Sequence, residues 1–208
     1  MERTRLVLVR HGQTEFNMMG KVQGHSDSPL TDLGRTQAHR AGRVLAERGI
    51  TRFLSSDLGR AMQTSAIIES YLGFPAQPDP RLREVCFGTL EGRTWEELDA
   101  YFEASNRAGL GTWFTHVPPG GESRAQMQDR AVRSLTSLCV AHPGETILVV
   151  SHGGFIGFFF RHVLSMTTEV RAIGFRTQNC AIHEFEWKAE QFHLLTWGES
   201  RHLVHLTE

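Results

Sequence analysis

Two segments of the chain combine a short apolar run with a histidine and a glycine at its end. His11 and Gly12 follow the apolar residues 6–9, and His152 and Gly153 follow the apolar residues 147–150. Continuous apolar runs of this length are typical of strands buried in a parallel sheet. Because ligands bind outside the carboxyl ends of such strands, both histidines are predicted to face one site. The glycine after each would let the backbone approach a ligand and present N–H groups to an anion.

The elements that must position these histidines alternate between strand and helix. Further strands are expected at residues 50–54 and near 76–79, and a closing hairpin is expected from residues 180–187 and 191–197. Capping-box patterns begin two of the expected helices, which cover residues 31–48, 58–71, 94–105, 123–141 and 155–164. This alternation predicts an α/β fold of three layers, α/β/α, with a mainly parallel central sheet.

The length of 208 residues favours one domain over residues 1–208. Within it, residues 85–125 are expected to form a small helical and loop insertion that builds part of the pocket wall. Four aromatic residues of this insertion would serve either its own packing or contact with substrate, at about even odds: Trp95, Phe102, Trp113 and Phe114.

Composition excludes several classes of protein. The net charge is -1 and no long run of one sign occurs, which argues against nucleic acid as a partner. No apolar stretch is long enough to cross a bilayer and no signal-peptide pattern opens the chain, so no membrane partner and a cytoplasmic location are expected. Three widely spaced cysteines show no redox or metal pattern. The 11 histidines include one close pair, His202 and His205, whose spacing is not that of a zinc site, so no metal or cofactor is expected.

Six short motifs stand in order between residues 6 and 160. They begin with Arg10-His11-Gly12-Gln13-Thr14-Glu15-Phe16-Asn17, and the others occupy residues 23–31, 55–64, 82–84, 118–123 and 150–154. Together they resemble the signature of the histidine phosphatase superfamily, the phosphoglycerate mutase-like proteins. A single motif of this kind would be weak evidence, whereas six in register are specific.

This resemblance implies a role for each matching residue. His11 would attack phosphorus and become a phosphohistidine, and Glu84 would protonate the leaving group and then activate water. Guanidinium groups offer fixed forks of donors to phosphate oxygens, so that the phosphoryl group would lie among Arg10, Arg60 and His152. Such a pocket can transfer a phosphoryl group without a metal. The resemblance assigns substrate binding to Asn17, Gln23, Gly24 and Gly153.

The same residues also have structural interpretations that involve no catalysis. Without its motif, His11 would be an ordinary core histidine, and Arg60 would be a solvated helix arginine, since most arginines are exposed. Glu84 has three other glutamates nearby, and any of these carboxylates could lie on the surface: Glu91, Glu96 and Glu97.

Three functions remain open at this point. A mutase of this family holds a second anion in a longer insertion with adjacent arginines. Here residues 85–117, 33 in number, contain only Arg93 and Arg107, which are not adjacent. This compact insertion, with Gln23-Gly24-His25, resembles the broad-specificity phosphatase branch. We therefore expect a metal-independent phosphatase acting on a small phosphorylated metabolite through His11; the alternatives are a cofactor-dependent phosphoglycerate mutase and a non-catalytic phospho-ligand binding protein. An exposed sheet edge would allow a homodimer.

Overall fold

A computed structural model of the chain describes residues 3–166, 175, 177–204 and 206. At its centre lies one sheet with the strand order β3-β2-β4-β1-β5-β6. The strands are β1 (Thr4–Arg10), β2 (Arg52–Ser55), β3 (Gln77–Pro78), β4 (Thr146–Ser151), β5 (Ile182–Lys188) and β6 (Gln191–Glu199). The first four run parallel, β5 is antiparallel to β1, and β6 is antiparallel to β5. The expected α/β fold with a mainly parallel sheet is therefore confirmed.

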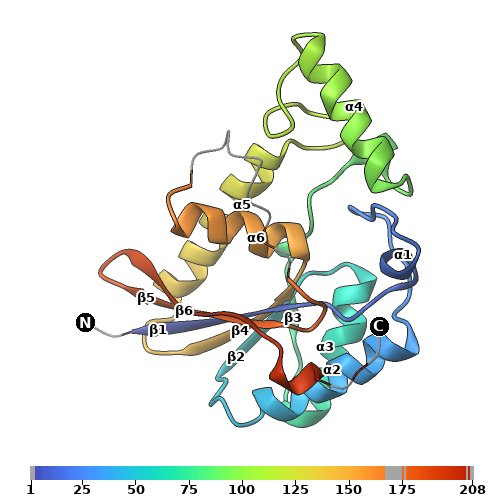
Figure 1. Cartoon of the computed structure of the whole chain (residues 1–208). Helices are drawn as coiled ribbons and strands as arrows, with labels where there is room; N and C mark the ends of the chain where they lie inside the picture. Colours follow the sequence, from blue (N-terminus) through green and yellow to red (C-terminus); the bar gives the residue numbers. More distant parts are fainter. Residues whose placement is uncertain (1–2, 167–174, 176, 205, 207–208) are drawn as a thin grey trace.

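Alternating side chains of β1 enter two separate cores. Leu6 and Leu8 belong to a buried cluster with residues of α5 (Arg124–Ala141) and α6 (Gly153–Val163). Val7 and Val9 belong to a second cluster with residues of α2 (Asp32–Leu45) and α3 (Gly59–Leu72). Successive side chains of a strand point to opposite faces, so helices must cover both. Figure 1 shows these two helical layers on either side of the sheet.

The helix α4 (Trp95–Arg107) stands beyond these layers, at the far end of α5 (Figure 1). Both expected capping boxes are present, with the Thr94 and Ser123 side chains accepting hydrogen bonds from the backbone N–H groups of Glu97 and Gln126. Short 3-10 helices lie outside the main elements: η1 (Pro80–Leu82), η2 (Gly88–Leu90) and η3 (Arg201–Leu203). Among the described residues, no helix has the length and hydropathy that a membrane span requires.

Two differences from the sequence-based expectation lie next to the carboxyl edge of the sheet. The stretch after His11, for which the sequence predicts no helix, contains the four-residue helix α1 (Glu15–Met18), which begins with a reciprocal capping box between Thr14 and Asn17. A single turn is too short to show helical periodicity, which explains why the pattern did not reveal it. The helix α6 begins at Gly153 rather than at residue 155, so its first turn lies directly at the carboxyl end of β4.

The register of the sheet determines which residues meet at its carboxyl edge. Arg10 at the end of β1 lies opposite Ser151 at the end of β4, and Ser55 at the end of β2 lies opposite Val150. The residues that follow each strand therefore leave the sheet side by side. This places His11 next to His152, as the two strand-and-histidine patterns predicted.

Close packing of two glycines fixes the segment that carries His11. A Cβ on Gly12 would lie 2.5 Å from the carbonyl oxygen of Gly34, and a Cβ on Gly34 would lie 2.0 Å from the carbonyl oxygen of Gln13. The prediction that Gly12 leaves its backbone free for a ligand is therefore wrong. Gly12 packs against α2, and its N–H donates to the Thr64 hydroxyl at 3.0 Å.

We expect Gly34→Ala to destabilise the fold by about 1–3 kcal/mol, the usual cost of inserting a methyl group against packed atoms. The free energy of unfolding is measured by urea denaturation. Gly157→Ala is the matched control, because Gly157 also lies within a helix and a Cβ there would meet no atom of another described element within 4 Å. The control should be neutral or stabilised by about 0.5–1 kcal/mol through higher helix propensity. Equal effects of the two substitutions would contradict the packing explanation.

Candidate active site

A cavity of about 700 Å³ opens at the carboxyl edge of the sheet. Its lining includes four of the predicted catalytic residues, Arg10, His11, Arg60 and Glu84. It also includes all of the predicted substrate-binding residues, Asn17, Gln23, Gly24 and Gly153. The fifth predicted catalytic residue, His152, is fully buried behind this lining, with its ring centroid 5.2 Å from that of His11. Sequence reasoning thus selected residues from five separate segments that the fold brings to one place.

The hydrogen bonds of His11 define its tautomer. Its Nδ1 lies 2.8 Å from the carbonyl oxygen of Gly12, which can only accept, so Nδ1 carries the proton. In the neutral ring Nε2 then keeps its lone pair. Arg60 donates its Nε–H to this Nε2 at 3.3 Å. The ring is therefore oriented with an unprotonated nitrogen toward the guanidinium group that would bind a phosphate.

The electrostatic surroundings keep both histidines neutral. Burial, followed by the positive charges of Arg60 and Arg10, holds the pKa of His11 well below its ordinary value of 6.5. Burial and the charge of Arg60 likewise hold the pKa of His152 well below its ordinary value. An imidazole must be neutral to act as a nucleophile, so this environment favours that state of His11.

Arg60 is held in place by loop carbonyls. It is 1% exposed, and its Nη groups donate to the carbonyl oxygens of Gly24 at 2.7 Å and Ser26 at 3.0 Å. The carboxylate of Asp27 lies 3.3 Å from Nη1 and also accepts from the backbone N–H of Arg60. These partners offset the cost of burying a guanidinium group and fix its direction.

Two buried polar atoms in the site have no protein partner within the described part of the chain: Arg10 Nε and His152 Nδ1. Arg10 is anchored through Nη1, which donates to the Thr177 carbonyl at 2.6 Å, and His152 is anchored through Nε2, which lies 2.7 Å from the Ser56 hydroxyl. A buried polar atom without a partner costs about 1–3 kcal/mol, so proteins keep few of them. Arg10 Nε is a donor, and His152 Nδ1 is a donor in the tautomer in which the Ser56 hydroxyl donates to Nε2, so both could serve phosphate oxygens in that state.

Glu84 caps the first turn of α6. Its Oε2 accepts from the N–H of Gly154 at 2.8 Å, and its Oε1 accepts from the N–H groups of Phe155 at 3.0 Å and Val85 at 2.9 Å. The N–H groups at a helix start have no intrahelical partner, and a carboxylate there is favourable. Because Oε2 receives a single donor, it has a free position from which a proton could be given or taken. A Cβ on Gly154 would lie 2.3 Å from Oε1, so glycine is needed for this contact.

The neighbouring glutamates lie elsewhere. Glu91 accepts from the N–H groups of His25 at 2.8 Å, Ser26 at 2.7 Å and Phe87 at 3.1 Å, and thereby ties the loop that holds Arg60 to the start of the insertion. Burial acts to raise the pKa of Glu91, but the hydrogen bonds from Ser26 and His25 outweigh it, and this pKa lies below its ordinary value. Glu97 belongs to a capping box, and Glu96 is exposed on α4. Glu84 alone of the four lines the cavity.

The four predicted binding residues reach the cavity in different ways. Asn17 uses Oδ1 to accept from Thr14 N and Asn179 Nδ2, which leaves its Nδ2 as a donor for a ligand. Gln23 accepts through Oε1 from the Ser28 hydroxyl at 3.3 Å, which likewise leaves its amide nitrogen as a donor. Gly24, at φ +57°, holds Arg60 through its carbonyl. Gly153 is the first residue of α6 and packs against Arg10, whose Nε would lie 3.3 Å from a Cβ there.

Sequence reasoning missed several residues of the lining, among them Asn179 and Lys21. Asn179 donates its Nδ2–H to the His11 carbonyl at 2.9 Å, and so braces the segment from the hairpin side. Lys21 also lines the cavity. Asn179 carried no signal because its position just before β5 becomes part of the site only through the sheet pairing. Lys21 lies between two matched motifs and belongs to neither.

The aromatic residues of the insertion divide between packing and cavity. Phe102 and Phe114 are buried in the core, and Trp113 packs beside Phe158 with ring centroids 6.0 Å apart. Trp95 is 51% exposed and lines the cavity. It is therefore the one of the four whose position allows contact with substrate.

A metal centre finds no support within the described ranges. There, no group of three or more histidine, cysteine, aspartate or glutamate side chains is arranged to hold an ion. The Cys139 and Cys180 thiols are buried, and Cys86 is half-buried without a disulfide partner.

Comparison with known proteins places this geometry in a family. A family model described as histidine phosphatase superfamily (branch 1) matches residues 6–200. A relative from Yersinia pestis named probable phosphoglycerate mutase GpmB is 35% identical over 202 residues, which cover 94% of this chain and 93% of that protein. The solved structure of Bacillus stearothermophilus YhfR aligns with a TM-score of 0.86 at 29% identity, over 96% of this chain and 99% of that one.

A mycobacterial glucosyl-3-phosphoglycerate phosphatase, solved in a complex with VO3, aligns with a TM-score of 0.79 at 33% identity. The alignment covers 94% of this chain and 99% of that one. Residues 6–200, which the family model matches, include all the site residues named above, from Arg10 to Asn179. The chain belongs to the histidine phosphatase superfamily.

Proposed function

We propose that this protein is a metal-independent phosphatase that hydrolyses small phosphate monoesters through a phosphohistidine at His11. The observation that carries the proposal is the His11 ring itself. It is neutral and fixed by the Gly12 carbonyl, and its Nε2 lies next to the guanidinium group of Arg60. Relatives are named as mutases and as phosphatases, so the family assignment supports phosphoryl transfer and leaves the acceptor to be argued.

The first half of the reaction forms the phosphoenzyme. The His11 Nε2 lone pair attacks phosphorus, the bond from phosphorus to the ester oxygen breaks, and Glu84 gives a proton to the departing oxygen. The Nε–H of Arg60 must leave Nε2 as the phosphoryl group arrives, and a phosphate oxygen can then accept it. Arg10 Nε and His152 Nδ1 are positioned to serve the other oxygens.

The second half returns the enzyme to its starting state. Glu84, now a carboxylate, takes a proton from water as the water oxygen attacks phosphorus. The bond from phosphorus to Nε2 breaks, inorganic phosphate leaves, and His11 is neutral again. Fixed charges around the phosphoryl group stabilise both transition states, because phosphoryl transfer depends mainly on positioning and electrostatics.

The insertion favours water over a second substrate as the acceptor. A mutase must retain a bisphosphorylated intermediate, so it needs a second site for a phosphate dianion. Neither arginine of residues 85–117, Arg93 or Arg107, is part of the cavity lining, whereas Trp95 and Phe87 are. Guanidinium forks are the usual partners of phosphate, and among the residues that the structure describes the insertion contributes none to the cavity lining.

The proposed activity is tested by incubating the protein with p-nitrophenyl phosphate and with 3-phosphoglycerate, each with and without EDTA. We expect phosphate release from both, unchanged by EDTA, and no formation of 2-phosphoglycerate. Isomerisation of 3-phosphoglycerate that is stimulated by 2,3-bisphosphoglycerate would establish the mutase instead. No turnover under any condition would favour a phospho-ligand binding protein, and loss of activity in EDTA would exclude the metal-free mechanism.

His11→Gln should abolish the phosphoenzyme and reduce kcat by at least about 10³-fold, because the amide cannot form the covalent intermediate. The measurement is acid-stopped labelling with radioactive substrate, followed by a test for the acid lability of a phosphohistidine. His39→Gln is the control, since His39 lies on the exposed face of α2 and its Nδ1 contacts Tyr71. Undiminished labelling of the His11 variant would place the nucleophile elsewhere.

Glu84→Gln should slow the hydrolysis of alkyl esters by about 10²–10⁴-fold, the usual contribution of a positioned acid–base group. Formation of the phosphoenzyme from p-nitrophenyl phosphate should change far less, because p-nitrophenolate leaves without a proton. The comparison uses single-turnover burst rates with both substrates, and Glu96→Gln on α4 serves as the exposed control. If both esters slowed by the same factor, Glu84 would not be the general acid.

A further inference from the structure

Glu84 lies in a segment that has no regular secondary structure. Residues 83–87, between the short helices η1 and η2, belong to neither helix nor strand. Backbone carbonyl groups of such a segment have no helix or sheet partner, so where water is excluded they need side chains to donate to them. The position of Glu84 therefore depends on the side chains that bind this stretch of backbone.

One arginine of α5, Arg130, binds three carbonyl groups of this backbone. Its Nη1 donates to the carbonyl oxygens of Arg81 at 2.9 Å and Arg83 at 2.8 Å. Its Nη2 donates to the carbonyl oxygen of Glu84 at 3.2 Å. A guanidinium group is a rigid planar fork of donors, so one side chain can hold several acceptors in a fixed relation to one another. Arg130 therefore fixes the path of the chain as it enters Glu84.

The carboxylate of Glu122 holds the guanidinium group in turn. Its Oε1 accepts from Nη2 of Arg130 at 2.5 Å and from the backbone N–H of Cys86 at 3.1 Å. The Arg130 and Glu122 side chains are only 23% and 21% exposed. Hydrogen bonds between charged groups are stronger than those between neutral groups, and partial burial limits their screening by solvent. The Arg130–Glu122 pair thus binds the chain on both sides of Glu84.

The carboxylate of Glu84 is sensitive to any shift of this backbone. Its donors on α6 are the N–H groups of Gly154 at 2.8 Å and Phe155 at 3.0 Å, and the helix sets their directions. A carboxylate that moved with its backbone would weaken these hydrogen bonds, and the free position on its Oε2 would be displaced. A misplacement of about 1 Å can cost on the order of 10²-fold in rate.

Arg130 is separate from the groups that would bind phosphate. Its recorded hydrogen bonds go to the backbone around Glu84 and to Glu122, and it is not part of the cavity lining. Arg60 has other partners, namely loop carbonyls and the carboxylate of Asp27. Loss of Arg130 would therefore disturb the proton donor and leave the phosphoryl end of the cavity in place.

We propose that Arg130 is a positioning residue for the general acid. Together with Glu122 it fixes the backbone that carries Glu84, and it acts on proton transfer to the leaving group and not on phosphate binding. The proposal rests on the function proposed above, in which Glu84 gives that proton. If Arg130 served the stability of the fold alone, its loss would lower the rates with all substrates by one common factor.

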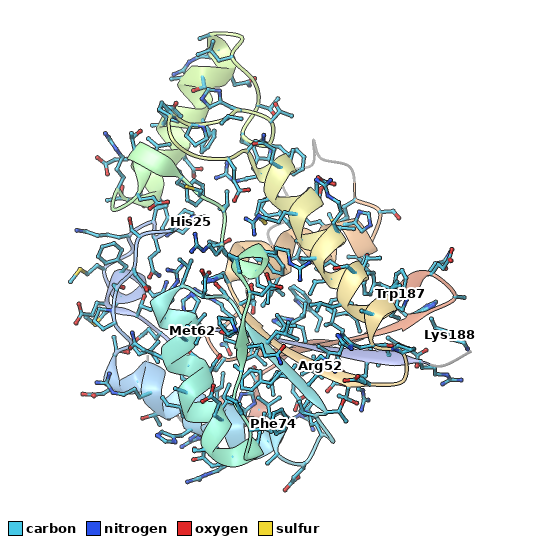
Figure 2. All side chains as sticks on the ribbon, turned by 180° about the vertical axis from the view of Figure 1, so that it is seen from behind. His25, Arg52, Met62, Phe74, Trp187 and Lys188 are labelled. Atoms are coloured by element: carbon cyan, nitrogen blue, oxygen red, sulfur yellow. The ribbon has the colours of Figure 1, made fainter. Side chains whose placement is uncertain are left out.

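The test compares esters that differ in their need for a proton. Single-turnover burst rates are measured with p-nitrophenyl phosphate and with an alkyl ester, glycerol 3-phosphate, for the protein as given, for Arg130→Met and for Arg52→Met. The Arg52 side chain is the matched control, because it forms a similarly half-buried ion pair, with Glu145, through two hydrogen bonds of 3.0 and 3.1 Å. It begins β2 at the opposite edge of the sheet, and Figure 2 shows it well apart from His25.

Arg130→Met should slow the alkyl ester by about 10–10²-fold, as expected for a displaced acid, and should change phosphoenzyme formation from p-nitrophenyl phosphate by less than about threefold. The KM values should change little, and Arg52→Met should leave both rates unchanged. Equal slowing of the two esters by Arg130→Met would overturn the proposal, and so would an unchanged rate with the alkyl ester. Absence of a phosphoenzyme in the unaltered protein would instead refute the proposed function, and this proposal with it.

A double variant shows whether Arg130 acts through Glu84. In a Glu84→Gln background, Arg130→Met should slow the alkyl ester by less than about twofold further, because residues that act as a unit have non-additive effects. Full additivity would overturn the proposal. Circular dichroism and urea denaturation check that each variant folds. Should Arg130→Met fail to fold, Arg130→Lys replaces it: the ammonium group keeps the charge beside Glu122 but lacks the planar fork, so the same selective slowing is expected.

Discussion

The neutral, oriented ring of His11 is the constraint on which the rest of the site depends. Burial lowers the pKa of the His11 ring, and the positive charges of Arg60 and Arg10 lower it further, so the unprotonated state is favoured. The Gly12 carbonyl then decides which nitrogen keeps the remaining proton. Arg60 thus acts twice: it keeps Nε2 unprotonated, and its Nε–H marks the direction from which a phosphate oxygen would be bound. Neither function would survive if the guanidinium group could rotate.

The fixed direction of Arg60 explains much of the surrounding structure. Burying a cation is costly unless it is hydrogen-bonded, and here the carbonyls of Gly24 and Ser26 supply the partners. Those carbonyls are in place because Glu91 binds the N–H groups of the same loop. Glu91 also accepts from Phe87, three residues after Glu84. Glu91 therefore holds both the loop that orients Arg60 and the segment that carries Glu84. The positions of these two residues are coupled through one carboxylate.

The sequence predicted those parts of the site that are set by local rules. Buried apolar runs that end in histidines predicted that His11 and His152 meet at the carboxyl edge of the sheet. Capping-box patterns predicted where α4 and α5 begin. What it could not give depends on packing between distant segments. Gly12 was expected to make room for a ligand, but it makes room for Gly34 of α2, which only the tertiary contact reveals. The cap that Glu84 forms on α6 likewise joins residues far apart in the chain, and no pattern near either residue indicates it.

The two ends of the cavity differ in how readily they accept substitutions. This difference bears on how one family includes proteins named as phosphatases and as mutases. The phosphoryl end consists of buried charged and polar groups that are anchored by hydrogen bonds, so a substitution there leaves a charge or a polar atom unsatisfied. The far wall consists of a lysine on a flexible stem and a half-exposed tryptophan, and few other contacts depend on either. Substitutions at the far wall therefore change what is bound beyond the phosphate at little cost to folding. In the proposed mechanism, this wall decides whether water or a second phosphorylated molecule can approach the phosphohistidine, since the His11 chemistry is the same for both acceptors. Neither Arg93 nor Arg107 lines the cavity, so the insertion offers a second phosphate no guanidinium fork, and the proposal of hydrolysis rather than isomerisation rests on that difference.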